Sequence, residues 1–67
     1  MSIAKVIEFK SSSTKSFDDA IKTGMAKARE SIRNIQSVWI KDQEITINPD
    51  GSFNEYRVLL KLTFVVD

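Results

Sequence analysis

The 67-residue sequence contains no cysteine and no histidine. These two absences exclude disulfides, zinc sites built from Cys and His, and haem ligation through His. They also exclude thiol nucleophiles and every catalytic triad that uses histidine. A chain of this length forms one domain with a small core, which usually needs disulfides, a metal or oligomerisation as support. We therefore predict a single domain over residues 1–67 that is stabilised by assembly.

The charge is nearly balanced, with ten Lys and Arg against nine Asp and Glu and a net charge of +1. The two signs are interspersed, so the basic stripe of a nucleic-acid-binding protein is missing. No apolar run approaches the roughly 18 residues of a membrane helix. Residues 1–5 lack the charged-then-apolar layout of a signal peptide. We expect a soluble, cytoplasmic protein without a nucleic-acid or membrane partner.

Hydrophobic periodicity predicts three strands and one helix. Residues 3–10 alternate as a strand with apolar side chains on both faces, and a polar break follows them. Residues 17–33 have the apolar stripe of an amphipathic helix. Residues 37–47 and 54–66 predict two further strands, which a tight turn at residues 48–51 joins. The order β-α-β-β places the chain in the α+β class.

The predicted helix has a clear start and an apolar stripe with small residues at its centre. Ser16 is a good N-cap, and Asp19 follows at the third helical position. The stripe consists of Phe17, Ala20, Ile21, Gly24, Ala28, Ser31, Ile32 and Ile35. Glycine within a helix costs about 1 kcal/mol relative to alanine. We interpret Gly24 as a site of close helix–sheet packing, with a tolerated defect as the alternative.

Residues 54–66 should form the central strand of the sheet. Tyr56 begins an apolar face that continues through every second residue to Val66. The turn at residues 48–51 pairs this strand with residues 37–47. A right-handed crossover through the helix then places residues 3–10 on its other side, antiparallel. We predict a three-stranded antiparallel sheet of order 1-3-2, with Val38 and Ile40 on the helix side.

One helix cannot cover both faces of this sheet. We expect the second face to carry Trp39, Ile45, Ile47, Leu59 and Val65, with Ser37, Lys41, Gln43, Arg57 and Lys61 between them. An exposed apolar patch of this size normally marks an interface. The residue pattern therefore predicts self-association.

Four segments along the chain resemble the dodecin family. They are KVIEF at residues 5–9, SFDDA at 16–20 after a Ser/Thr-rich break, AKARESIRNI at 26–35 and EYRVLLKLTF at 55–64. Each is weak alone, but their order and spacing over the whole chain are specific. The resemblance implies a sheet partly wrapped around one helix, in a hollow spherical homododecamer. It also implies non-enzymatic storage or sequestration of a flavin such as riboflavin or FMN.

The two key flavin-binding positions of the family differ in this sequence. Flavin-binding members stack the ring on a Trp that opens the second strand, and a Gln on the third strand hydrogen-bonds the ring edge. These positions align with Ser37 and Arg57 here. Serine offers no flat π surface, and arginine donates hydrogen bonds but accepts none. The resemblance therefore implies a small-molecule shell with an altered flavin site.

Trp39 and Arg57 each have two interpretations. Trp39 shares the parity of Ser37, about 6.6 Å along the strand, so it either stacks a ligand from a shifted position or packs at a subunit contact. Arg57 either binds an anion such as phosphate or carboxylate, or forms an intersubunit salt bridge with Glu44 or Glu55. The candidate ligand-binding residues are Ser37, Trp39, Lys41, Gln43 and Arg57.

A branch of dodecin-like proteins without the stacking Trp, and with Arg in place of the Gln, is described as binding calcium. Calcium takes six to eight oxygen ligands, and symmetry would have to bring Asp42, Glu44 or Glu55 together from several subunits. A calcium-binding or purely structural dodecamer is therefore an alternative. Residues 48–52 do not form an EF-hand loop, because their Gly is misplaced and flanking helices are missing. Catalysis is not expected, since no pair of carboxylates has a spacing that suggests a cleft.

Overall fold

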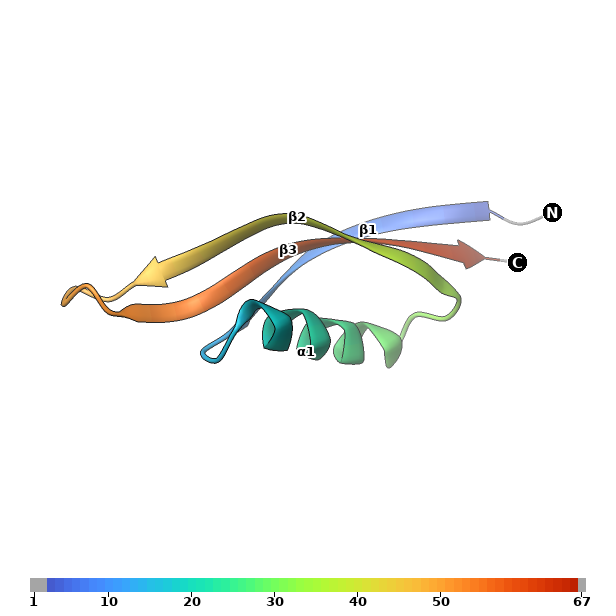
Figure 1. The fold of residues 1–67 in the computed structure, drawn as a ribbon. Coiled ribbons are helices and arrows are strands. Elements are labelled where there is room, and N and C mark those ends of the chain that lie inside the picture. The colour runs from blue at the N-terminus through green and yellow to red at the C-terminus, as the bar shows by residue number, and fades with distance from the viewer. Residues whose placement is uncertain (1–2, 67) are drawn as a thin grey trace.

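The computed structural model describes residues 3–66, which form one helix packed on a three-stranded sheet (Figure 1). Residues 1, 2 and 67 of the predicted domain lie outside the described residues. The first two belong to the N-terminal segment that is predicted not to be a signal peptide. The elements are β1 (Ile3–Ser13), α1 (Phe17–Arg29), β2 (Ile35–Ile47) and β3 (Phe53–Val66). β3 is central and antiparallel to both neighbours, which confirms the predicted order 1-3-2.

β1 is three residues longer than predicted. Its serine-rich end continues the ladder, with Ser11 opposite Val58 and Ser13 opposite Tyr56. The Ser11 hydroxyl also donates a 2.8 Å hydrogen bond to the Ala20 carbonyl of α1. The Ser11 hydroxyl is therefore satisfied by the helix. Residues 11–13 of the predicted break are strand, while residues 14 and 15 form the bend before α1.

The N-terminus of α1 is capped as predicted. Ser16 Oγ accepts a hydrogen bond of 2.9 Å from the Asp19 N–H, which satisfies one of the free amides of the first turn. The Asp19 carboxylate accepts a 2.6 Å hydrogen bond from Ser13 Oγ at the end of β1. The cap therefore also fixes the connection between strand and helix.

The helix ends at Arg29, four residues before the predicted end at Arg33. The N–H of Glu30 donates to the Lys27 carbonyl at 3.2 Å, a bond that tightens the last turn. Asn34 then adopts a left-handed conformation with φ of 60°. This conformation, which asparagine tolerates, turns the chain into β2.

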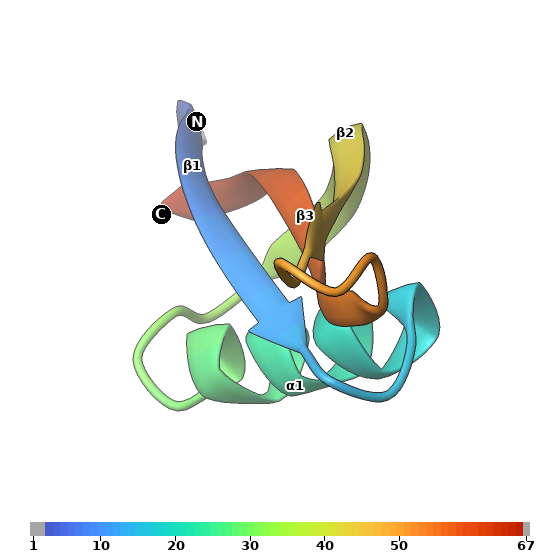
Figure 2. The ribbon, with the colours of Figure 1, turned by 90° about the vertical axis from the view of Figure 1, so that its left-hand side faces the viewer.

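The core lies between α1 and the neighbouring strands β1 and β3 (Figure 2). The buried apolar residues are Ala20, Ala28, Val58, Leu60 and Leu62. Phe9, Phe17 and Ile21 pack against the cluster of Ala20, Val58 and Leu60. The predicted helix stripe and the predicted apolar face of β3 thus meet in one small core.

Gly24 lies where α1 approaches β1 most tightly. A Cβ atom there would lie 2.9 Å from the Ser11 Cβ and 3.2 Å from the Phe9 Cε2. These separations are too short for ordinary side-chain contacts, so the interpretation of Gly24 as a close-packing site is confirmed.

The helix covers less of the sheet than predicted. Val38 and Ile40 lie opposite Leu62 and Leu60 and so share the helix-side face. They nevertheless remain 36% and 41% exposed, because α1 packs on β1 and β3 while β2 bends away from it (Figure 2). An apolar part of the helix-side face is therefore also uncovered.

The chain is elongated, measuring 54 × 19 × 13 Å with a radius of gyration of 14.0 Å. A compact domain of this length has a radius of gyration of about 11 Å. The β2–β3 hairpin extends beyond the start of α1 (Figure 1), and its turn is closed by the Gly51 N–H donating to the Asn48 carbonyl at 2.9 Å. Gly51 has a φ of 90°, as the predicted tight turn requires. Within residues 3–66, no helix has the length and hydropathy needed to span a membrane.

Candidate functional site

The sheet face turned away from α1 is called the open face here. Leu60 and Leu62 are buried on the helix side, so alternation turns Lys61 and its neighbours on β3 the other way. Residues opposite one another in an antiparallel sheet share a face. The open face therefore includes Ala4, Val6, Glu8, Lys10 and Ser12 of β1, Ser37, Trp39, Asp42 and Glu44 of β2, and Arg57, Leu59, Lys61, Thr63 and Val65 of β3.

A β-bulge at Lys41 shifts the alternation of β2. The register moves from Ile40 opposite Leu60 to Asp42 opposite Leu59. An extra residue of this kind reverses the side on which all later residues lie. Gln43 consequently lies opposite Val58, on the helix side.

The bulge overturns part of the predicted open face. Ile45 lies opposite Tyr56 on the helix side, as Gln43 lies opposite Val58. The predicted placement of Gln43 and Ile45 beside Trp39 is therefore wrong. Asp42 and Glu44 occupy the open face in their place. Ile47 lies beyond a further irregularity after Thr46, where it pairs with Phe53.

Trp39 stands on the open face beside two lysines. Its side chain is 60% exposed, and its partner across the strands is Lys61. The Nζ atoms of Lys61 and Lys41 lie 5.5 Å and 5.8 Å from the centre of the indole ring. Both distances are within the range of cation–π attraction. The Trp39 ring is therefore an exposed π surface in a cationic setting.

The surroundings of Trp39 include one carboxylate and two hydroxyls. Lys41 Nζ donates a 3.0 Å hydrogen bond to Glu8 Oε1 of β1. Ser37 and Thr63 lie opposite one another, two residues from Trp39 and Lys61 along their strands and on the same face. The structure thus places Lys41 beside the Trp39 ring, with Ser37 two residues from Trp39 on the same face. It adds Glu8, Lys61 and Thr63, whose proximity only the strand register reveals.

Arg57 is not part of this group. It lies four residues before Lys61 on β3, about 13 Å away along the strand. Its Nε and Nη2 atoms donate to Glu55 Oε1 at 3.3 Å and 3.0 Å. An ion pair of Arg57 was predicted between subunits, whereas the structure shows one within the chain, with Glu55. Glu44 lies opposite Arg57 on β2. The five candidate ligand-binding residues do not converge on one point.

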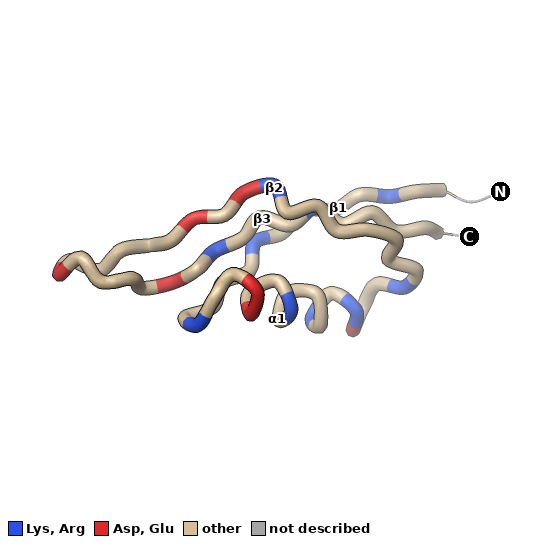
Figure 3. Tube along the Cα trace, viewed as in Figure 1, with Lys and Arg blue, Asp and Glu red and all other residues tan. Residues whose placement is uncertain are grey.

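The carboxylates offered as calcium ligands do not assemble within one chain. In the part of the chain that the structure describes, no cluster of three or more Asp, Glu, His or Cys side chains could hold a metal ion. Asp42 and Glu44 are exposed on the open face, and Glu55 is paired with Arg57. Charges of both signs are spread over the strands and helix (Figure 3).

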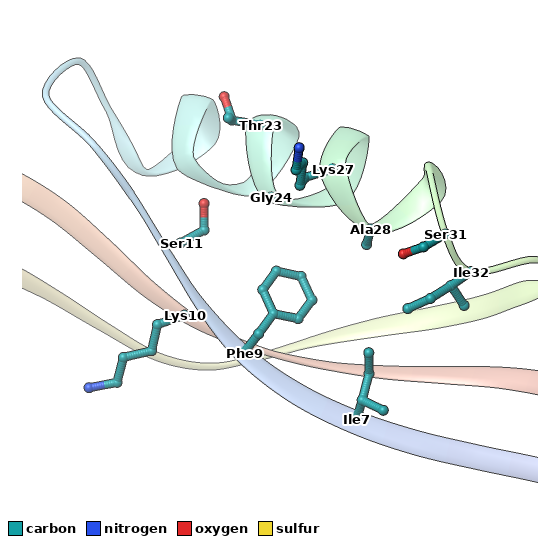
Figure 4. A pocket seen from close by; sticks show the side chains of 10 residues that line it. All are labelled: Ile7, Phe9, Lys10, Ser11, Thr23, Gly24, Lys27, Ala28, Ser31 and Ile32. Atoms are coloured by element: carbon teal, nitrogen blue, oxygen red, sulfur yellow. The ribbon is translucent and has the colours of Figure 1, made fainter.

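A second concave surface lies between α1 and β1 (Figure 4). This groove has a volume of about 470 Å³, and the Phe9 ring points from β1 toward the helix. Its walls include Ile7, Gly24, Ala28 and Ile32. The groove is mainly apolar and brings together no set of catalytic groups, so it suits packing rather than chemistry.

Comparison with known proteins gives the same family for the whole described chain. The Dodecin family model matches residues 3–67, while no curated protein matches the chain. A dodecin variant from Thermus thermophilus is 27% identical, covers 100% of this chain and 98% of its own, and has a TM-score of 0.89. The Streptomyces coelicolor dodecin is 23% identical over 98% of this chain and 93% of its own, with a TM-score of 0.91.

A third similar structure is a calcium-chelating immunodominant antigen, calcium dodecin, from Mycobacterium tuberculosis. It is 25% identical, covers 97% of this chain and 91% of its own, and has a TM-score of 0.84. The family match spans almost the whole chain, and the TM-scores of 0.84 to 0.91 show that these three proteins share its fold. The chain belongs to the dodecin family.

Proposed function

We propose that this chain forms a homododecameric shell that binds small molecules for storage or sequestration and performs no turnover. Membership of the dodecin family supports this function. The observation that carries it is the open face, where the exposed Trp39 ring stands beside Lys41 and Lys61. An exposed aromatic ring with neighbouring polar groups is a typical platform for a flat ligand.

Self-association accounts for the large apolar surface of the single chain. The core is small, and many large apolar side chains are exposed. Apart from Trp39 of the candidate site, they are Ile3, Val6, Ile7, Val38, Ile40, Ile47, Phe53 and Val66. Apolar surface of this extent marks interfaces in stable proteins, and its burial between subunits would supply the stabilisation that a small core lacks.

The proposed cargo is a flavin, FMN or riboflavin, bound at an altered position. Ser37 leaves the usual stacking position without a ring, whereas Trp39 lies two residues along on the same face. A flavin stacked on Trp39 would therefore be shifted along the strand. Riboflavin added to micromolar protein should lose fluorescence as its ring stacks. Unchanged fluorescence would contradict flavin binding.

The assembly and the altered position are tested separately. Light scattering coupled to size exclusion should give a mass about twelve times the 7.6 kDa of one chain. The double variant Ser37→Trp with Arg57→Gln should gain about tenfold in flavin affinity, because it restores a ring and a two-way hydrogen-bonding side chain. No gain would show that these two positions do not form the binding site.

A calcium-binding or purely structural dodecamer is the second candidate. The similarity to calcium dodecin and the exposure of Asp42 and Glu44 on the open face favour it. Because calcium needs six to eight oxygens, several subunits would have to contribute them. Calcium should then raise the melting temperature of the assembly, since an ion that binds only the folded state stabilises it. Unchanged melting and size in EDTA would contradict the calcium role and leave the structural one.

A further inference from the structure

We propose that Trp39 and Lys61 form a site that selects planar aromatic molecules carrying an anionic group, such as a phosphate, over neutral ones. The proposal rests on the proposed function and names the ligand class of its shifted site. The ring of Trp39 supplies the stacking surface, and Lys61 supplies the charge that distinguishes the two classes of ligand.

The Trp39 ring has surface available for a ligand. Among the described residues, the aromatic contacts join Phe17, Phe53 and Tyr56, at the hairpin and the start of α1. Trp39 takes part in none of these contacts and is 60% exposed. A planar ligand could therefore cover part of the ring without disturbing the core.

The two lysines beside Trp39 differ in their charge partners. Lys41 Nζ lies 3.0 Å from Glu8 Oε1, so its charge is balanced within the chain. Lys61 forms no ion pair with any described residue, although Glu8 is its register partner on β1. The charges of Glu8, Lys41 and Lys61 sum to one positive charge beside the indole ring. An anionic ligand would neutralise this charge.

Two hydroxyl groups flank the ring on the same face. Ser37 and Thr63 are paired across β2 and β3, directly beyond the Trp39–Lys61 pair. A hydroxyl both donates and accepts hydrogen bonds, so it can meet either kind of polar atom on a ring edge. This arrangement suits a heteroaromatic ring stacked on Trp39, with its anionic group directed to Lys61.

The charge on Lys61 gives the site its selectivity. A neutral ring gains stacking and hydrogen bonds alone, whereas an anionic one also gains a charge-assisted contact with the Lys61 ammonium. The contact is partly screened, because the site is open to water. The preference should therefore be moderate and sensitive to ionic strength.

The test uses FMN and riboflavin, which share one ring system but differ in the phosphate. Trp39 is the sole tryptophan of the chain, so its fluorescence reports directly on the site. We expect FMN to bind roughly threefold to tenfold more tightly than riboflavin at low salt. The preference should vanish in Lys61→Met and at about 0.5 M salt. Lys15→Met, an exposed loop lysine, is the matched control and should keep it.

The outcomes separate this inference from the function on which it rests. Equal binding of both flavins, lost in Trp39→Ala but not in Lys15→Met, would overturn the anion preference while the proposed function holds. A preference for FMN that persists in Lys61→Met would also overturn it. Binding of neither flavin would overturn both. Trp39→Phe, which keeps a smaller ring, replaces Trp39→Ala if that variant fails to assemble, and each variant is checked by its mass in solution.

Discussion

The two faces of β3 differ in what surrounds them. On the helix side, Val58, Leu60 and Leu62 are completely or almost completely buried. On the open face, Lys61 lies between Glu8 of β1 and Trp39 of β2. One strand therefore supplies both the core and the candidate recognition surface. The difference shows that stability and ligand binding depend on alternate residues of the same segment, and substitutions can address each separately.

The largest expected effect comes from opening the core on the helix side. Leu60→Ala removes a fully buried side chain at the centre of the sheet and should lower the free energy of unfolding by about 2–5 kcal/mol. Leu59 is its half-buried neighbour on the open face, so Leu59→Ala should lower the free energy of unfolding by clearly less. Urea unfolding of both variants at one chain concentration measures the difference. Equal losses would show that the assembly buries the two faces alike.

The next largest effect should come from forcing α1 away from β1. Gly24→Ala places a Cβ atom 2.9 Å from the Ser11 Cβ. Overpacking costs about 1–3 kcal/mol, and the higher helix propensity of alanine offsets about 1 kcal/mol. We expect a net loss of stability in thermal unfolding, and partial recovery in the double variant with Ser11→Gly. Thr23→Ala, at an exposed helix position, is the control. Increased stability of Gly24→Ala would contradict close packing.

A smaller effect should follow loss of the helix cap. Ser16→Ala removes the acceptor of the 2.9 Å bond from the Asp19 N–H and should cost about 1 kcal/mol. Ser16→Asp keeps an acceptor and should restore most of that stability. The same unfolding measurement, combined with the FMN titration, should show altered stability with unchanged binding. A matching loss of affinity would link the cap to the open face.

The smallest effect concerns the hairpin turn, which lies outside both faces. Hydrogen bonds from the Ser52 hydroxyl and N–H hold the pKa of Asp50 below its ordinary value of 3.8. Because the folded-state pKa is lowered, the stabilisation is present above the unfolded-state value. It is lost as the pH falls from about pH 4 through the folded pKa. Asp50→Asn should therefore unfold with a weaker pH dependence in acid than the parent chain. Identical acid profiles would contradict this contribution.

The fold was predictable from its alternation and turn chemistry, but the helix end was not. The apolar face of β3 from Tyr56 onward, the turn at Gly51 and the right-handed crossover rule together predicted the sheet order. The apolar stripe continued through Ser31, Ile32 and Ile35, and this pattern favoured a longer helix. Asn34, a residue that tolerates the left-handed conformation of helix ends, was the competing local signal. In the folded chain, pairing of Ile35 with Phe64 ends the helix early.

The candidate site was predictable only in part, because the bulge and the register arise from long-range pairing. Strict alternation placed Ser37 and Trp39 correctly on one face, since both precede Lys41. Strict alternation placed Gln43 on the wrong face, because the bulge at Lys41 reverses the faces and no glycine in the sequence marks it. The partnership of Trp39 with Lys61 depends on how two distant segments align, which the pattern of either segment leaves open. For Arg57 the sequence left an anionic ligand and an intersubunit salt bridge open, and in the structure its side chain pairs with Glu55 of the same strand.

The central position of β3 has a consequence for how the chain folds. β3 follows β1 and β2 in the sequence, yet it is the strand with which both of them pair. Ile3, for example, lies opposite Val66. During synthesis neither outer strand has a partner until β3 emerges from the ribosome, and distant pairings of this kind slow folding. The chain should therefore fold late and in one cooperative step, with the apolar side of β2 exposed to chaperones until then.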